Sequence, residues 1–233
     1  ASVIASITAD TGTSGATLSG STTVSASSGV ATFSGLSIDK AGSGYTLTLT
    51  SSGLTSAVTS EFSILSASAS TLAFSVQPSG GTAGYTSALS STVVITDSLG
   101  NVVTDASSDI TVAITSGTGD SSGELLGIAT VTAGDGIATF SAVRIEKAAS
   151  GYTLTATASL LTSAVSSSFN ISPAAAATLA FSTEPGGSAA NRAWDIQPTV
   201  LVQDSYGNDV TSVGSVPVSL AIKSGTGVSG ANL

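Results

Sequence analysis

The chain of 233 residues contains no cysteine, no histidine and no methionine. Without cysteine it has no disulfide framework, so its stability must come from a hydrophobic core alone. The missing side chains exclude thiolate catalysis, imidazole acid-base chemistry, Ser-His-Asp triads and zinc sites built from His or Cys. A hydrolase with paired carboxylates stays open to this composition, but no Asp/Glu pair stands out beyond turn positions. We therefore expect no enzyme, no catalytic residue and no cofactor.

Charge is also scarce, since only 8% of the residues are charged and five basic residues face fourteen acidic ones, for a net charge of -9. Globular proteins usually carry about 25% charged residues. The shortage of basic side chains argues against nucleic acid as a partner. Serine and threonine must cover most of the surface, which suits extracellular stalks, self-associating fibres or glycosylated surfaces. The sequence shows neither a signal-peptide pattern nor an 18-residue apolar stretch, so we expect no membrane span in this segment.

The chain repeats itself at a fixed spacing. The string SGYTLT occurs at 43–48 and again at 150–155, and the stretch around it keeps the same offset. TLAFSVQP, from Thr71, returns as TLAFSTEP, from Thr178. The phenylalanines obey the spacing in three pairs: Phe33 with Phe140, Phe62 with Phe169, and Phe74 with Phe181. A period of about 107 residues matches an independently folding domain rather than one turn of a solenoid.

Linker-like runs of small residues, LSASAS and SPAAAA, precede each TLAF string. They predict a partial repeat at 1–69, a complete repeat at 70–176 and a partial repeat at 177–233. The chain is longer than two periods, and the surplus shows as duplication, because the segments 2–7 and 216–222 both match DITVAI at 109–114. We favour a window cut from a longer array. Exchange of strands between copies is the alternative, and it would leave one strand too many.

Apolar and polar residues alternate with period two in segments bounded by Gly, Ser, Asn and Asp, as in short antiparallel strands. Ile110, Val112 and Ile114 fall on one face of such a segment. We count seven or eight strands per unit and no helical stretch. The predicted fold is all-β, with tandem Ig-like antiparallel β-sandwiches of about 107 residues. The predicted core and corner residues are Phe33, Tyr45, Phe62, Phe74, Phe140, Tyr152, Phe169 and Phe181.

Each of two tyrosines, Tyr45 and Tyr152, follows a glycine at the start of a late strand. This arrangement is typical of the tyrosine corner of Ig-like sandwiches, in which the hydroxyl ties the strand to a neighbouring loop. A repeated corner would explain why SGYTLT occurs twice.

The segments VVITDSLGNVV, at 93–103, and VLVQDSYGNDV, at 200–210, share the pattern V-x-V/I-x-D-x-x-G-N-x-V, and GIATF follows the first at 136–140. With these motifs the chain resembles the bacterial Ig-like repeats of large surface adhesins, of the invasin and intimin type, over essentially its whole length. The resemblance implies rigid extracellular rods at the cell surface that hold an adhesive tip away from the cell, and related arrays in filaments. The scarcity of charge departs from the family, and the chain contains no recognisable tip domain.

The function that follows is a structural segment of a repetitive extracellular bacterial surface protein, forming a rod, a stalk or a self-assembling filament. The alternative is an adhesive module that binds carbohydrate or protein. The expected partners are the chain itself, end to end or laterally, or neighbouring repeats of a longer chain, and then glycans or host and cell-surface proteins.

Four acidic and amide positions lie in matching turns, Asp97 with Asn101 and Asp204 with Asn208, and Asp209 follows the second pair. Asp and Asn favour turns by local hydrogen bonding. Calcium binding is the alternative, although calcium needs six to eight oxygen ligands and a denser acidic loop. No other metal is expected.

A second recurring charged pair is Asp39-Lys40, which returns as Glu146-Lys147. We interpret it as a solvated pair in a turn, with a Lys-Asn isopeptide crosslink as the alternative.

Asn170-Ile171-Ser172 is a glycosylation sequon, for which chance is the simpler explanation. Three aromatic residues have no matching aromatic in the other units and could serve an interface or stack on carbohydrate, although for Trp194 local packing is the competing interpretation. They are Tyr85, Trp194 and Tyr206.

Overall fold

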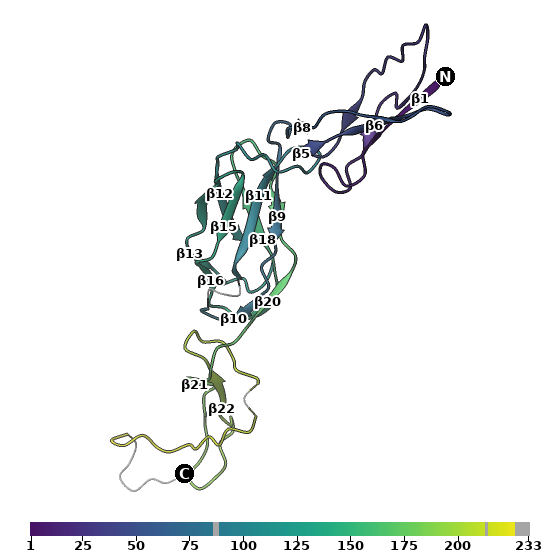
Figure 1. Cartoon of the computed structure of the whole chain (residues 1–233). Coiled ribbons are helices and arrows are strands. Elements are labelled where there is room, and N and C mark those ends of the chain that lie inside the picture. The colour runs from purple at the N-terminus through teal and green to yellow at the C-terminus, as the bar shows by residue number, and fades with distance from the viewer. Residues whose placement is uncertain (86–88, 213, 227–233) are drawn as a thin grey trace.

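The computed structural model describes residues 1–85, 89–212 and 214–226. Across these residues the chain is built from short β-strands and loops, which confirms the predicted all-β class. In the part described there is no helix with the length and apolar character needed to span a membrane. Figure 1 shows an elongated molecule, with β1 and β6 in the lobe at one end, β9 to β20 in the middle, and β21 and β22 toward the other end.

The described residues of the middle lobe form four sheets. Their strand orders are β15-β11-β9, β14-β12-β18-β19, β10-β20-β17 and β13-β16, with all pairs antiparallel except β10 with β20. The strands are β9 (Thr71–Val76), β10 (Gly81–Thr82), β11 (Ser91–Thr96), β12 (Asp109–Ile114), β13 (Leu125–Gly127), β14 (Thr130–Thr132), β15 (Ile137–Phe140), β16 (Val143–Ile145), β17 (Ala149–Tyr152), β18 (Leu154–Thr157), β19 (Ala164–Val165) and β20 (Phe169–Ser172).

These described strands outnumber the seven or eight predicted for the unit, because continuous runs change partners along their length. β17 and β18 are separated only by Thr153, yet β17 pairs with β20 while β18 pairs with β12. A run that passes from one sheet to another counts as two strands while it contributes side chains to a single core.

The core lies where the sheets face one another. Period-two alternation places Val93 and Ile95 of β11, Ile110 of β12, Phe140 of β15 and Leu154 of β18 in one buried cluster. Each such side chain contributes roughly 1.5–3 kcal/mol when it is fully buried. Packing of two main sheets on a shared apolar layer is the arrangement of a β-sandwich.

Strand pairs that lie one repeat spacing apart in the sequence form equivalent hydrogen-bonded ladders. β1 pairs with β3 and β6, as β12 pairs with β14 and β18, and β21 pairs with β22, as β9 pairs with β11. The pairs β2-β4, β5-β8 and β6-β7 likewise match β13-β16, β17-β20 and β18-β19. The strands are β1 (Ser2–Ile7), β2 (Leu18–Ser19), β3 (Thr23–Ser25), β4 (Ser37–Ile38), β5 (Gly42–Tyr45), β6 (Leu47–Thr50), β7 (Ala57–Val58), β8 (Phe62–Ile64), β21 (Thr178–Thr183) and β22 (Thr199–Gln203).

Two segments match a strand in sequence and yet form none. Residues 30–33 correspond to β15, which pairs with β11, and residues 1–64 contain no counterpart of β11. Residues 216–222 correspond to β12, and no described residue occupies the places of β14 and β18 beside them. A strand sequence needs a partner to become a strand, because its backbone hydrogen bonds are made with a neighbour.

The eight predicted core and corner residues differ in how deeply their side chains are buried. Tyr45, Tyr152, Phe140 and Phe169 are buried, and Phe33, Phe62 and Phe74 are partly buried. The prediction is wrong for Phe181, which is 47% exposed. Phe181 lies on the hairpin of β21 and β22, and among the described residues no second sheet packs on that hairpin.

A glycine in the left-handed region closes the buried tyrosine pocket of the middle unit. Gly119 has φ of +67°, and a methyl group added there would overlap the ring of Tyr152. Gly117, two residues earlier, has φ of +79° but faces open space. A side chain at Gly117 would therefore add backbone strain alone, whereas one at Gly119 would add both strain and steric overlap.

We expect Gly119→Ala to destabilise the middle unit by about 3 kcal/mol, from left-handed strain and overpacking together. Gly117→Ala, the matched control, should cost about 1–2 kcal/mol from strain alone. Hydrogen exchange of the β12 and β18 amides measures the free energy of opening in each of the two variants. Equal losses in the two variants would show that the Tyr152 pocket is not tightly packed.

Candidate functional site at the repeat junctions

The turn after β11 is organised around the carboxylate of Asp97. One carboxylate oxygen, Oδ1, accepts the backbone N–H groups of Leu99 and Asn101, both at 2.9 Å. The backbone closes the same turn, since the N–H of Asp97 donates to the carbonyl of Asn101 at 2.9 Å. Gly100 adopts φ of +82° inside it, a conformation that favours glycine.

The second carboxylate oxygen of Asp97, Oδ2, reaches outside the turn. It accepts the side-chain amide of Asn101 and the backbone N–H of Ala67, both at 3.0 Å. Ala67 belongs to the linker-like run that precedes β9. Asp97 is 1% exposed, so four donors surround a buried carboxylate and one of them comes from the linker.

Asn101 carries the contact into the preceding lobe. Its Nδ2 donates to the carbonyl oxygen of Asp39, and its Oδ1 accepts the N–H of Ala41, both at 3.0 Å. Residues 39–41 form the turn between β4 and β5. The side-chain amide thus bonds both a donor and an acceptor of that turn, which fixes the orientation of the amide plane.

The same set of contacts recurs after β22. Asp204 Oδ1 accepts the N–H groups of Tyr206 and Asn208, and its Oδ2 accepts the Asn208 amide and the N–H of Ala174, at 2.8–2.9 Å. Asn208 Nδ2 donates to the carbonyl of Glu146 at 2.7 Å, and its Oδ1 accepts the N–H of Ala148 at 2.9 Å. Every partner lies one repeat spacing after its counterpart in the first set. We call each set a junction clamp: Asp97, Asn101, Ala67, Asp39 and Ala41 in the first, and Asp204, Asn208, Ala174, Glu146 and Ala148 in the second.

The buried tyrosines also form hydrogen bonds with the clamped turns. Tyr45 donates its hydroxyl to the carbonyl of Lys40 at 2.9 Å, and Tyr152 does the same to Lys147 at 3.0 Å. Each ring also stacks on a phenylalanine, Phe62 or Phe169, with centroids 6.0 Å apart. The turn that receives the next repeat is therefore tied to the core of its own repeat.

Tyr206 lies at the second junction. Its side chain is partly buried and packs against the core cluster of the middle unit. A methyl group at Gly84 would overlap the Tyr206 hydroxyl, so the glycine allows this close approach. The amine of Lys147 adds a hydrogen bond to the Tyr206 carbonyl oxygen at 3.1 Å. At the first junction Leu99 occupies the place of Tyr206 and is exposed.

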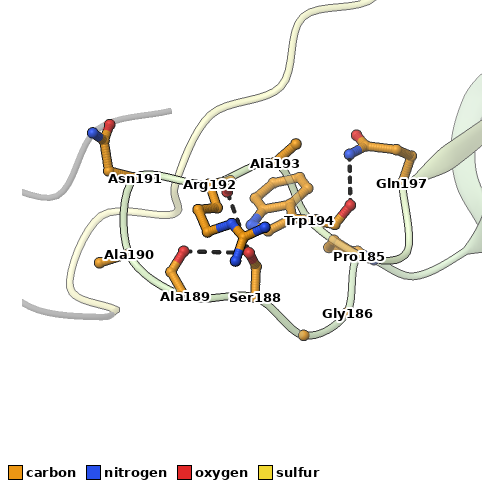
Figure 2. Close-up of a pocket in the computed structure, with 11 residues that line it drawn as sticks. Pro185, Gly186, Ser188, Ala189, Ala190, Asn191, Arg192, Ala193, Trp194 and Gln197 are labelled. Carbon is orange, nitrogen blue, oxygen red and sulfur yellow. Dashed lines mark hydrogen bonds between the residues drawn. The ribbon is translucent and has the colours of Figure 1, made fainter.

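Neither Trp194 nor Tyr85 is one of the residues of the two clamps. Figure 2 shows Trp194 in a loop beside Arg192, with Gln197 donating to the Trp194 carbonyl oxygen at 2.9 Å. The partly buried indole also lines an apolar hollow together with Phe181, Pro185, Pro198, Leu220 and Ile222. Tyr85 is 64% exposed.

In the second clamped turn the charged residues are paired differently from our interpretation. The side chain of Glu146 bonds Arg144, with Nε and Oε1 3.1 Å apart, rather than the adjacent Lys147. Both amide hydrogens of Asn208 are used, one by Glu146 and one by Asp204. Asn170, the sequon residue, is exposed on β20, and its Oδ1 accepts the N–H of Gly151 at 2.9 Å.

Over the described ranges, no group of three or more His, Cys, Asp or Glu side chains is placed to hold a metal ion. The carboxylates of Asp97 and Asp204, which the sequence offers as alternative calcium ligands, each accept four hydrogen bonds from N–H donors. At each junction these hydrogen bonds and those of the asparagine connect backbone groups of two repeats.

No family model and no curated protein matches this chain. Among solved structures, a crystal structure of a beta-glycosidase from Bacteroides vulgatus matches with 13% identity and a TM-score of 0.35. The match covers 72% of this chain and 21% of that one. At this TM-score the likeness carries no argument about fold family or activity.

The electrostatics of the first clamp follow from its donors. Desolvation raises the pKa of the Asp97 carboxyl, but hydrogen bonds from the Asn101 side chain and from the N–H groups of Ala67, Asn101 and Leu99 lower it to about 2, from 3.8. The pKa of Asp204 is likewise lowered despite desolvation, chiefly by Asn208. A carboxylate that accepts several N–H bonds is stabilised in its charged form.

Because the folded-state pKa of Asp97 lies below its unfolded value, the clamp contributes full stability above pH 3.8 and loses it as pH falls toward 2. We expect the amide resonances of Leu99 and Asn101 to titrate with a midpoint near pH 2 in an NMR pH series. The Asp97→Asn variant, which has no carboxyl at this position, should lack that titration. A midpoint at or above the ordinary value would show that the four donors do not hold the carboxylate.

Proposed function

We propose that this chain is a structural segment of a repetitive extracellular bacterial surface protein, in which Ig-like sandwiches in series form a rod, a stalk or a filament. The observation that carries the proposal is the recurrence of the junction clamp. Two junctions, one repeat spacing apart, join neighbouring lobes through equivalent atoms of equivalent residues. Equivalent junctions give each pair of neighbouring domains the same relative orientation. Domains joined in series with a constant orientation form a regular rod.

Stiffness is the physical property that the clamp supplies. Neighbouring domains joined by small-residue linkers move relative to one another by default. Here the linker N–H groups of Ala67 and Ala174 are bound to buried carboxylates, and each junction asparagine bonds the preceding turn twice. Hydrogen bonds to a charged acceptor are about twice as strong as neutral ones. The clamp therefore opposes bending at each junction.

The sheet surfaces support the same role without using charge. Threonine hydroxyls pair across neighbouring strands, as in Thr8 with Thr48 and Thr115 with Thr155, both at 2.8 Å. Such pairs each stabilise a sheet by a few tenths to about 1 kcal/mol. An uncharged hydroxyl surface of this kind suits a long extracellular array, and the absence of His and Cys from the chain supports a non-enzymatic function.

Two of the three aromatic residues considered for an adhesive module, Tyr206 and Trp194, support the structural role as well. Tyr206 packs over Gly84 at a junction, and Trp194 lines a hollow with Phe181 and two prolines. Both contribute packing between or within repeats.

We expect Asn101→Ala to loosen the first junction without unfolding either lobe. Because the chain has no cysteine, Ser60→Cys and Ser107→Cys place one spin label in each lobe of the full chain. Electron-electron double resonance should give a narrow distance distribution in the parent and a clearly broader one in Asn101→Ala. Ser98→Ala, an exposed change in the same turn, is the matched control and should keep the narrow distribution.

A broad distribution in the parent protein would contradict the rod. An unchanged distribution in Asn101→Ala would show that the clamp does not set the geometry. Circular dichroism of each variant checks that the β-structure is intact.

A further inference from the structure

We propose that the middle unit bears tension along the chain, and that the parallel ladder between β10 and β20 is the contact that resists the pull. The inference rests on the proposed function, because sandwiches joined in series transmit any pull that is applied to the array. It adds a mechanical function to the structural one and assigns it to two short segments of the middle unit.

The chain enters and leaves the middle lobe at opposite ends. Figure 1 shows β5 and β8 next to one end of this lobe, and β21 and β22 beyond the other. The linker at 65–70 leads into β9, and residues 173–177 follow β20. We call residues 71–83, which contain β9 and β10, the first segment, and residues 166–172, which contain β20, the last segment. A pull through the neighbouring repeats therefore acts on the start of the first segment and on the end of the last one.

The first and last segments are joined by the parallel ladder. Gly81 of β10 lies opposite Ile171 of β20, and Thr82 lies opposite Ser172. The N–H of Ala83 extends the contact by donating to the carbonyl oxygen of Ser172 at 2.8 Å. All other strand pairs of the middle lobe described above are antiparallel, so this ladder differs from them in the direction of its strands.

The contact between the two segments continues on the other side of the ladder. The side chain of Gln77 accepts the backbone N–H of Ser167 at its Oε1, at 2.8 Å. Gly80 has φ of +76°, and a methyl group added there would overlap the carbonyl oxygen of Asn170. The first segment therefore touches the last one from Gln77 onward to the end of the ladder.

The direction of the strands determines how the ladder is loaded. Because β10 and β20 are parallel, a pull on the start of the first segment and on the end of the last one moves the two strands in opposite directions along a common axis. Such a load strains neighbouring hydrogen bonds together, whereas a load across a hairpin opens them one at a time. Tension lengthens the middle unit only when one of the two segments leaves the fold. The ladder joins both segments, so it must break whichever segment leaves first.

Both segments are also anchored in the core. Leu72 of the first segment and Phe169 and Ile171 of the last one are buried in the cluster of the middle unit. Ala83 is fully buried as well, so water does not compete for its hydrogen bond while the fold is intact. Separation of the segments therefore costs apolar burial in addition to hydrogen bonds.

Stretching single molecules of the full chain at constant force tests the ladder. Unfolding of the middle unit is identified by its step, roughly 300–350 Å for the extension of residues 71–172. Ala83→Pro removes the N–H that donates to Ser172. We expect it to shorten the lifetime of the folded middle unit about tenfold at a given force, because forced unfolding follows the unfolding rate.

Ala133→Pro is the matched control. Ala133 is also buried, and its N–H donates to the carbonyl oxygen of Ser108 at 2.9 Å, but neither residue belongs to the first or the last segment. Hydrogen exchange should show a comparable loss of equilibrium stability in the two proline variants. The lifetime under force should stay that of the parent in Ala133→Pro, because its contact is intact when the two segments separate.

A milder variant tests the same contact if Ala83→Pro does not fold. Gln77→Ala leaves the backbone unchanged and removes the exposed side-chain bond to Ser167. We expect the lifetime under force to fall roughly threefold. Thr132→Ala is its control, since it removes an exposed side-chain bond to Asp109, between β14 and β12, and should keep the parent lifetime.

Two results would overturn the proposal. One is an equal shortening of the lifetime by each variant and its control, which would show that force reports general stability. The other is a parent lifetime in Gln77→Ala and in a folded Ala83→Pro, which would show that the ladder does not resist the pull. Either result leaves the rod standing, since the spin-label distances across the first junction test the rod separately.

Discussion

The organisation of this molecule depends on a buried carboxylate with four hydrogen-bond donors, Asp97 at one junction and Asp204 at the next. An unpaired buried carboxylate would be costly, so each of its donors is constrained as long as the carboxylate stays charged. Two donors shape the turn, one orients the asparagine, and one holds the linker. A single charge thereby sets the local turn and the position of the neighbouring repeat.

The clamp fixes one repeat relative to the next because the turn that it binds is itself held in place. The turn at 39–41 is held by Asn101 of the following repeat and by Tyr45 of its own repeat, through adjacent backbone groups. Tyr45 is in turn stacked on Phe62. Contacts therefore run without a break from the core of one repeat, through its tyrosine and its turn, into the buried carboxylate of the next. This continuity accounts for the equivalent geometry of the two junctions.

Much of the fold and part of the junction site could be predicted from the sequence. The features that could not be predicted were missed for physical reasons. Alternation of residue types predicted the buried face of β12, because a side chain's face in a strand depends on its local position. The turn residues Asp97 and Asn101 were recognised, but local turn chemistry explained them fully, so their bonds to Ala67 and to residues 39–41 left no signal at short range. The exposure of Phe181 was missed because the burial of a side chain depends on which strands lie beside it. The string TLAF occurs in both β9 and β21, but the strands around it differ between the two among the described residues.

The clamps and the cores stabilise different features of the structure. A clamp fixes the orientation of two units through few atoms, and it supplies almost no apolar burial. A core supplies the burial, but it requires strands from both sheets of the same sandwich. The segments at the two ends of this chain have clamps without complete cores among the described residues, which leaves them oriented but with exposed Leu179 and half-covered Phe33.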